Sequence, residues 1–198
     1  MLSGGVDSVA LLKKLLEETD EDIYVHHFHL KSFENTYFKK AEAKALRKIV
    51  PYMKKAFRDF HYTESTIDVR QIMNLLPVYH RINNNGSKNF YLPDQTYYSL
   101  IGGILAKITS SPNIYTGTCK EDYNSVGENI AYWFEEEAKE NMNKIIEGGA
   151  CPFKPKIQRP HDEVTKKQII KYLGKELMDM VWYCRYPIKK NGSLLSCN

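Results

Sequence analysis

The sequence has no long apolar run, no secretory leader pattern and few cysteines. No stretch approaches the roughly 20 apolar residues that span a membrane, and the first residues show no secretory leader pattern. Four cysteines in 198 residues are too few for a disulfide scaffold. A net charge of +4 suits anionic ligands but is too small to indicate nucleic-acid binding by itself. We therefore expect a cytoplasmic globular protein, without membrane contact, that forms one domain over residues 1–198.

A Walker-type phosphate loop is also absent, because no Gly-Lys-Ser/Thr follows the glycines near the N-terminus. The chain has a different glycine turn there, followed by an amphipathic helical pattern. Paired glycines allow positive φ and let an anion approach the backbone, and the N–H groups of a first helical turn bind phosphate. The residues predicted to hold the phosphates are Ser3, Gly4, Gly5, Val6, Asp7 and Ser8.

The polar residues of this turn have separate expected roles. Asp7 or Ser8 is expected to cap the helix, and Asp7 is also placed to hold Mg²⁺ beside the phosphates. The hydroxyls of Ser3 and Ser8 add hydrogen-bond donors. The alternative is an ordinary Gly-Gly turn that caps an ordinary helix.

Strand-like and helix-like segments alternate along the first half of the chain. Strands are predicted within 23–30, 57–69 and 113–117, and helices within 32–55 and 92–108. This order predicts an α/β protein with an open parallel sheet and helices on both faces. Pro51 is expected to kink or end its helix. Gly102 and Gly103 imply close packing against the sheet or a partner helix.

Acidic residues follow the strand predicted at 113–117. Ligands bind at the carboxyl edge of an open α/β sheet, so Glu121 and Asp122 are candidate site residues, with plain surface charge as the alternative. His26, His27 and His29 in the strand at 23–30 permit a metal site, but polar residues beside a nucleotide pocket are the favoured interpretation.

The helix predicted at 32–55 is rich in lysine and arginine. Its inner face is expected to contain Phe38, Ala41, Ala45, Ile49 and Tyr52. The residues that point mostly outward are Lys39, Lys40, Lys44, Arg47 and Lys48. Such a basic helix can contact nucleic acid, but the pattern is more typical of a solvated face.

The glycine turn resembles the PP-loop of the N-type ATP pyrophosphatases, and further segments resemble the 7-cyano-7-deazaguanine synthase branch of that family. Thr116-Gly117 with Glu121-Asp122-Tyr123 is similar to that branch's Gly-x-Asn-x-Glu-Asp-Tyr stretch. Pro160 with Val164-Thr165-Lys166 is similar to its Pro and Leu-Thr-Lys segment. Trp182-Tyr183-Cys184 and Cys197 match its Trp-x-Cys and the second of four clustered zinc cysteines.

The resemblance implies a Rossmann-like nucleotide hydrolase fold and an ATP-dependent ligase that forms AMP and pyrophosphate. Its substrates would be 7-carboxy-7-deazaguanine and ammonia. Its product would be the corresponding 7-deazaguanine amide or nitrile, as in queuosine biosynthesis. Asp7, Ser8, Asp122 and Lys166 would be the catalytic residues, with ATP and Mg²⁺ at the turn. For Lys166 the alternative is an ordinary surface lysine. Cys184 and Cys197 would bind structural Zn²⁺ in a tail over residues 182–198. Relatives are homodimers, and direct nucleic-acid binding is not expected.

Departures from the branch bear on the substrate. Asp94-Gln95 stands where relatives usually have Arg-Asn, and Phe28-His29-Leu30-Lys31 replaces their Tyr-Gly-Gln-Arg-His. The third and fourth zinc cysteines are not in the sequence, and only Met1 and Leu2 precede the turn, so we expect a longer chain at both ends. The rival functions are another PP-loop enzyme, such as a tRNA thiolase or amide ligase, and a catalytically idle nucleotide-binding module. Cys119 and Cys151 are interpreted as core or surface thiols.

Overall fold

The structure is a computed structural model, and it forms two compact units. The residues that it describes are 1–31, 36–68, 80–82, 88–90, 94–117, 119–120, 155–182, 188–190 and 193–195. The first unit contains Met1–Ile67, Tyr115–Asp122 and Ile157–Asn198, and the second contains Asp68–Ile114 and Tyr123–Lys156. The expectation of one domain over residues 1–198 stays a prediction.

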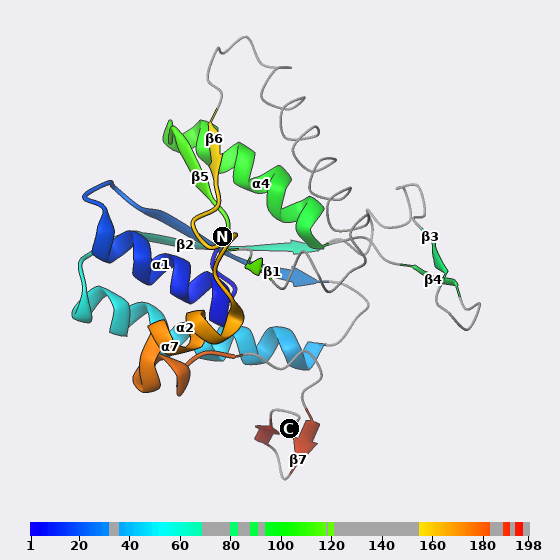
Figure 1. The fold of residues 1–198 in the computed structure, drawn as a ribbon. Helices are drawn as coiled ribbons and strands as arrows, with labels where there is room; N and C mark the ends of the chain where they lie inside the picture. Colours follow the sequence, from blue (N-terminus) through cyan, green and yellow to red (C-terminus); the bar gives the residue numbers. More distant parts are fainter. Residues whose placement is uncertain are drawn as a thin grey trace. The chain divides into compact units, whose positions relative to one another are not determined.

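Two parallel strands lie at the centre of the first unit. β1 (Tyr24–Lys31) and β2 (His61–Asp68) run side by side in the same direction and are joined by α2 (Thr36–Ala56), as Figure 1 shows. The backbone N–H of Leu2 donates to the carbonyl of His26 at 2.9 Å, so the residues before the glycine turn lie against β1. The sequence thus correctly predicted a mixed α/β protein with a strand, helix and parallel strand in succession.

Three helices cover one side of this strand pair (Figure 1). α1 (Val6–Glu18) packs against α7 (Lys166–Met178), and α2 contacts β1. The apolar stripes predicted from the sequence are buried, because each amphipathic helix turns that stripe inward. The core residues from the two N-terminal helices include Val9, Leu12, Leu15, Leu16, Ala41, Ala45 and Ile49.

The expectations for Pro51 and for Gly102 are tested only in part. α2 continues past Pro51 to Ala56, and the exposed Pro51 ring lies on the solvent side of the helix, where it does not disturb the buried stripe. The helix predicted at 92–108 is α4 (Asp94–Thr109) in the second unit. A Cβ added at Gly102 would meet no described atom within 4 Å, so close packing of Gly102 is not seen among the described residues, and packing against a partner helix stays a prediction.

The remaining strands are short. β3 (His80–Ile82) and β4 (Lys88–Phe90) pair antiparallel, as do β7 (Ile188–Lys190) and β8 (Ser193–Leu195). β5 (Asn113–Tyr115), within the strand predicted at 113–117, pairs with β6 (Lys156–Gln158). The larger open sheet with helices on both faces and the zinc-binding tail stay predictions.

Candidate functional site

The glycine turn before α1 is shaped by close contact with α2. Gly4 has φ +81°, a conformation that favours glycine, and it is buried. A Cβ at this position would lie 3.2 Å from the carbonyl oxygen of Glu42 and 3.2 Å from Cγ of Leu46. The turn therefore needs glycine both for its backbone conformation and for its approach to the neighbouring helix.

The two serines of the turn are hydrogen-bonded within it. The Ser3 hydroxyl oxygen accepts from the Gly5 N–H at 3.2 Å, and the Ser3 N–H donates to Oγ of Ser8 at 3.2 Å. Ser8 in turn donates to the Gly5 carbonyl at 3.1 Å, and the two hydroxyl oxygens are 3.0 Å apart. These bonds hold the turn in one shape, and the predicted role of both hydroxyls as phosphate donors remains a prediction.

The start of α1 has no side-chain cap. Its N-cap residue is Gly5, and no side chain bonds to the first turn as a cap. The expectation that Asp7 or Ser8 caps the helix is wrong, because the helix begins at Val6 and places both residues inside its first turn. The first-turn N–H groups have no acceptor within the helix, and this end carries the positive pole of the helix dipole.

Asp7 and Lys166 meet beside this helix end. Nζ of Lys166 donates to Oδ2 of Asp7, although the two residues are 159 positions apart in the sequence. The other carboxylate oxygen of Asp7, Oδ1, is buried and has no hydrogen-bond partner among the described residues. A buried carboxylate oxygen without a donor is a ligand of the kind that Mg²⁺ prefers. The structure thus brings together two of the predicted catalytic residues.

Lys166 is held in place by the start of α7. Thr165 is the N-cap of this helix and accepts from the Gln168 N–H at 3.3 Å, while the Gln168 side chain accepts from the Thr165 N–H at 2.8 Å. This reciprocal pair is a capping box. It fixes the first residue of α7, Lys166, next to the start of α1, against which α7 packs.

The segment after β5 also reaches the start of α1. A Cβ at Gly117 would lie 3.1 Å from the Asp7 carbonyl oxygen, so this glycine permits close backbone contact. The Thr116 N–H donates to the Gln158 carbonyl at 3.0 Å, and Oγ1 of Thr116 is buried without a partner in the described part of the chain. Gly117, the last residue of the strand predicted at 113–117, thus lies against the start of α1. Glu121 and Asp122 lie outside the described residues.

His161 is a buried residue near the site that the sequence analysis did not single out. Its side chain is 3 % exposed, and Nδ1 has no hydrogen-bond partner among the residues that the structure describes. Burial lowers the pKa of His161, and the charge of Lys14 lowers it further, while Asp7 and Glu18 oppose the change. The ring is therefore neutral at pH 7. The one signal in the sequence is its place directly after Pro160, within the segment that carries the family resemblance.

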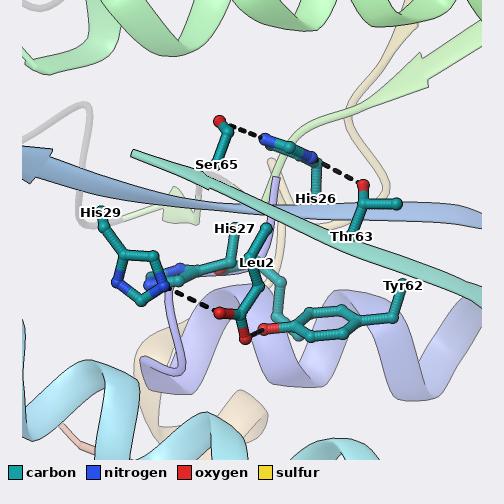
Figure 2. Close-up of polar contacts among 8 residues, drawn as sticks. Leu2, His26, His27, His29, Tyr62, Thr63 and Ser65 are labelled. Atoms are coloured by element: carbon teal, nitrogen blue, oxygen red, sulfur yellow. Dashed lines mark hydrogen bonds and ion pairs between the residues drawn. The ribbon is translucent and has the colours of Figure 1, made fainter. Parts of the chain in front are cut away.

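The three histidines of β1 lie on two faces of the strand pair, His26 on one face and His27 and His29 on the other (Figure 2). Both ring nitrogens of His26 are bonded, to Oγ1 of Thr63 at 2.7 Å and to Oγ of Ser65 at 2.8 Å. His27 is buried and bonds through Nδ1 to the Leu2 carbonyl at 2.8 Å, directly before the glycine turn. Burial lowers the pKa of both rings. His26 and His27 thus stabilise the strand pair and the entry to the turn.

Glu64 of β2 is the partner of His29, and the sequence analysis did not identify it. Its carboxylate pairs with Nε2 of His29 at 2.8 Å and accepts from the Tyr62 hydroxyl at 2.7 Å. Hydrogen bonding from His29, then from Tyr62, lowers the pKa of Glu64, whereas burial raises that of Tyr62. Among the described residues, no group of three or more His, Cys, Asp or Glu side chains is arranged to hold a metal ion.

The segment that leads to the predicted zinc tail also contacts the turn. The Trp182 N–H donates to the Gly4 carbonyl at 2.9 Å, and a Cβ at Gly5 would lie 3.5 Å from the Trp182 carbonyl oxygen. Cys184, Cys197 and Cys151 lie outside the described residues, so the zinc site stays a prediction. Cys119 is fully buried in the core, which agrees with its interpretation as a core thiol and not with the surface alternative.

Comparisons with known proteins add no assignment. No family model matches the sequence, and neither the curated proteins nor the solved structures contain a match. No described helix is long and apolar enough to cross a membrane.

Proposed function

We propose that the glycine turn and the start of α1 bind the triphosphate of ATP, and that the chain is a PP-loop ATP pyrophosphatase. The observation that carries this proposal is an uncapped helix N-terminus that follows a buried glycine turn and lies beside the Asp7–Lys166 ion pair. Backbone N–H groups and a lysine at one helix end are a general arrangement for binding phosphate. Asp7 supplies an oxygen ligand next to that phosphate site.

The residues of the site suit the charges of a bound nucleotide. Val6, Asp7 and Ser8 offer N–H groups to phosphate oxygens, and Lys166 brings a positive charge to the same place. Oδ1 of Asp7, which is buried without a partner in the described structure, would hold Mg²⁺, and this ion would neutralise charge on the phosphates. Fixed donors and charges of this kind stabilise charge that develops at phosphorus.

The proposed substrate and product come from the family resemblance. A carboxylate oxygen of 7-carboxy-7-deazaguanine attacks the α phosphorus of ATP, the bond to the bridging oxygen breaks, and pyrophosphate leaves. Ammonia then attacks the acyl carbon, and AMP leaves to give the amide. The resemblance also proposes Asp122 as a catalytic residue and Zn²⁺ on Cys184 and Cys197, a Rossmann-like sheet, a cytoplasmic location and a homodimer.

A pyrophosphate-release assay tests this function. The full chain is incubated with ATP and Mg²⁺, with and without 7-carboxy-7-deazaguanine and ammonium, and compared with Asp7→Ala and the control Asp20→Ala. Asp20 is exposed in the loop after α1. We expect substrate-dependent pyrophosphate release that Asp7→Ala reduces by about 100-fold or more, with unchanged circular dichroism, while Asp20→Ala retains it.

Other outcomes identify the rival functions. ATP binding without pyrophosphate release under any condition indicates an idle nucleotide-binding module. Release that depends on added tRNA in place of the deazaguanine indicates a tRNA-modifying PP-loop enzyme. Full release by Asp7→Ala would refute the role proposed for this carboxylate.

A further inference from the structure

The solvent side of α2 is a continuous basic face. Between residues 40 and 55 the exposed side chains of this helix are all basic, with Pro51 as the one exception. At 3.6 residues per turn these positions fall within an arc of roughly 100°. We call this set the α2 basic face: Lys40, Lys44, Arg47, Lys48 and Lys55.

The charges of the α2 basic face have no bonded partner in the described part of the chain. Within the described part of the structure, none of its five side chains forms an ion pair or a hydrogen bond. Other lysines of the same unit do pair, as Lys54 does with Asp59 at 2.7 Å and Lys14 with Glu18 at 3.0 Å. The single acid of α2, Glu42, is buried on the opposite side of the helix, with 9 % of it exposed. The five side chains of the face are thus all positive, and an acid beside the face, Glu176, accepts from the Tyr52 hydroxyl of α2 at 2.9 Å.

Positive charge is concentrated in this helix. α2 contains seven lysines and arginines against one glutamate, a net charge of +6, whereas the whole chain has +4. The rest of the chain therefore sums to −2, the difference between +4 and +6. The small overall charge hides a local field that can attract a polyanion.

We propose that the α2 basic face binds the phosphate backbone of a double-stranded nucleic acid. The face runs from Lys40 to Lys55, a rise of about 22 Å at 1.5 Å per residue, and one strand of a duplex places about six phosphates along that length. Four of its five residues are lysines, flexible point charges that contact phosphate without reading bases. Binding is thus expected to be independent of sequence and strongly dependent on salt.

The structure favours a duplex over the other polyanions. Binding of single strands relies on aromatic side chains on which bases stack, and the α2 basic face has none. Helices that lie on membranes insert an apolar face, but the apolar side of α2, with Leu46, Ile49 and Met53, is buried in the core. A duplex backbone requires only the row of charges that the helix presents.

This proposal is independent of the proposed ATP chemistry. Gly4 of the glycine turn meets α2 at Glu42 and Leu46, which lie on the side of the helix away from the basic face. A duplex bound to the basic face and a nucleotide bound at the turn therefore use different surfaces of the first unit. Either one can be absent without the other.

The test compares two triple variants of the full chain. Lys40→Gln, Lys44→Gln and Lys48→Gln remove three charges from the basic face. The matched control, Lys167→Gln, Lys171→Gln and Lys175→Gln, removes three exposed charges from α7 at the same spacing. These lysines share only the sequence spacing of the α2 set, because Gly174 between Lys171 and Lys175 has a non-helical backbone. The exposed Glu163 precedes the control set and the exposed Glu176 follows it. Fluorescence anisotropy measures binding to a 20-base-pair RNA duplex, the DNA duplex of the same sequence and phosphatidylserine vesicles, over a range of salt.

We expect the unmodified chain to bind a duplex with an affinity that falls steeply as salt rises. The α2 variant should bind at least about tenfold more weakly at about 50 mM salt, and its salt slope should be smaller by about 2.7, or 0.9 for each lost contact. The duplex affinity of the α7 control should stay within about twofold of that of the unmodified chain. Lys→Arg at the three α2 positions should retain binding, and the tighter of the two duplexes identifies RNA or DNA as the partner.

Three results would overturn the proposal. The first is an absence of duplex binding at low salt by the folded chain. The second is an equal loss of binding in the α7 control, which would mean that overall charge alone is responsible. The third is tighter binding to the vesicles than to either duplex, since that would identify a membrane surface. None of these results depends on whether ATP is hydrolysed.

Discussion

Replacing Gly4 by alanine tests whether the glycine turn has the shape that the ATP proposal requires. At φ +81° an L-residue is strained by about 1–2 kcal/mol relative to glycine. The added Cβ also lies 3.2 Å from a backbone oxygen of α2 and 3.2 Å from the Leu46 side chain. Contacts this short force a shift of the helix or the turn, so the total cost should be about 2–3 kcal/mol, in the range of strained core substitutions.

This loss should appear in thermal and denaturant unfolding. For a chain of 198 residues, about 2 kcal/mol lowers Tm by roughly 4–8 °C. Gly102→Ala is the control, because its Cβ would meet no described atom within 4 Å and Gly102 lies inside α4 with ordinary φ. Alanine there should be neutral or stabilise by up to about 1 kcal/mol. Equal Tm values for the two variants would refute the close contact of the turn with α2, and with it the preformed phosphate site.

Three further changes test other parts of the first unit. Gly174→Ala should cost about 1–3 kcal/mol from backbone strain alone, since Gly174 has φ 73° and ψ 171° and a Cβ there meets no described atom; Tm measures it. Thr165→Ala should cost about 1 kcal/mol by removing the α7 capping box, and Thr165→Ser should restore it. Burial lowers the pKa of His27 in the folded state, so the unfolded chain binds the proton more readily. The free energy of unfolding should therefore fall as pH drops below about 6.5, and His27→Gln should flatten that dependence in denaturant titrations.

The sequence predicted the parts of the fold that depend on local patterns. The apolar stripe of α1 and the inner face of α2 could be predicted, because burial in an amphipathic helix follows a 3.6-residue period. The cap of α1 could not, since Asp7 and Ser8 are both good capping residues and only the backbone path through Gly5 decides where the helix starts. Pro51 was expected to kink or end its helix; it does not end it, because its exposed position lets α2 continue to Ala56, and the kink stays a prediction.

The site was predictable only in part. The turn was found from its glycines and serines, and Lys166 was grouped with it through family resemblance. Nothing in the spacing of the sequence shows that Lys166 pairs with Asp7, because the contact depends on the packing of α7 against α1. The same holds for the pairing of Glu64 with His29 across neighbouring strands and for the burial of His161. Contacts between distant segments are decided by tertiary packing, which no local period encodes.

The glycine turn is held rigidly by its contacts, which affects how tightly it would bind a ligand. Its serines bond to the turn itself, Gly4 is enclosed by α2, and the Trp182 N–H holds the Gly4 carbonyl. A turn fixed in this way loses little conformational entropy when an anion binds, so more of the interaction energy appears as affinity. Lys166 differs, because its ammonium already pairs with Asp7. In the proposed function, an arriving phosphate would share or replace that carboxylate as the partner of Lys166, which would leave Asp7 to a cation. Phosphate and divalent cation should therefore bind together more tightly than either does alone.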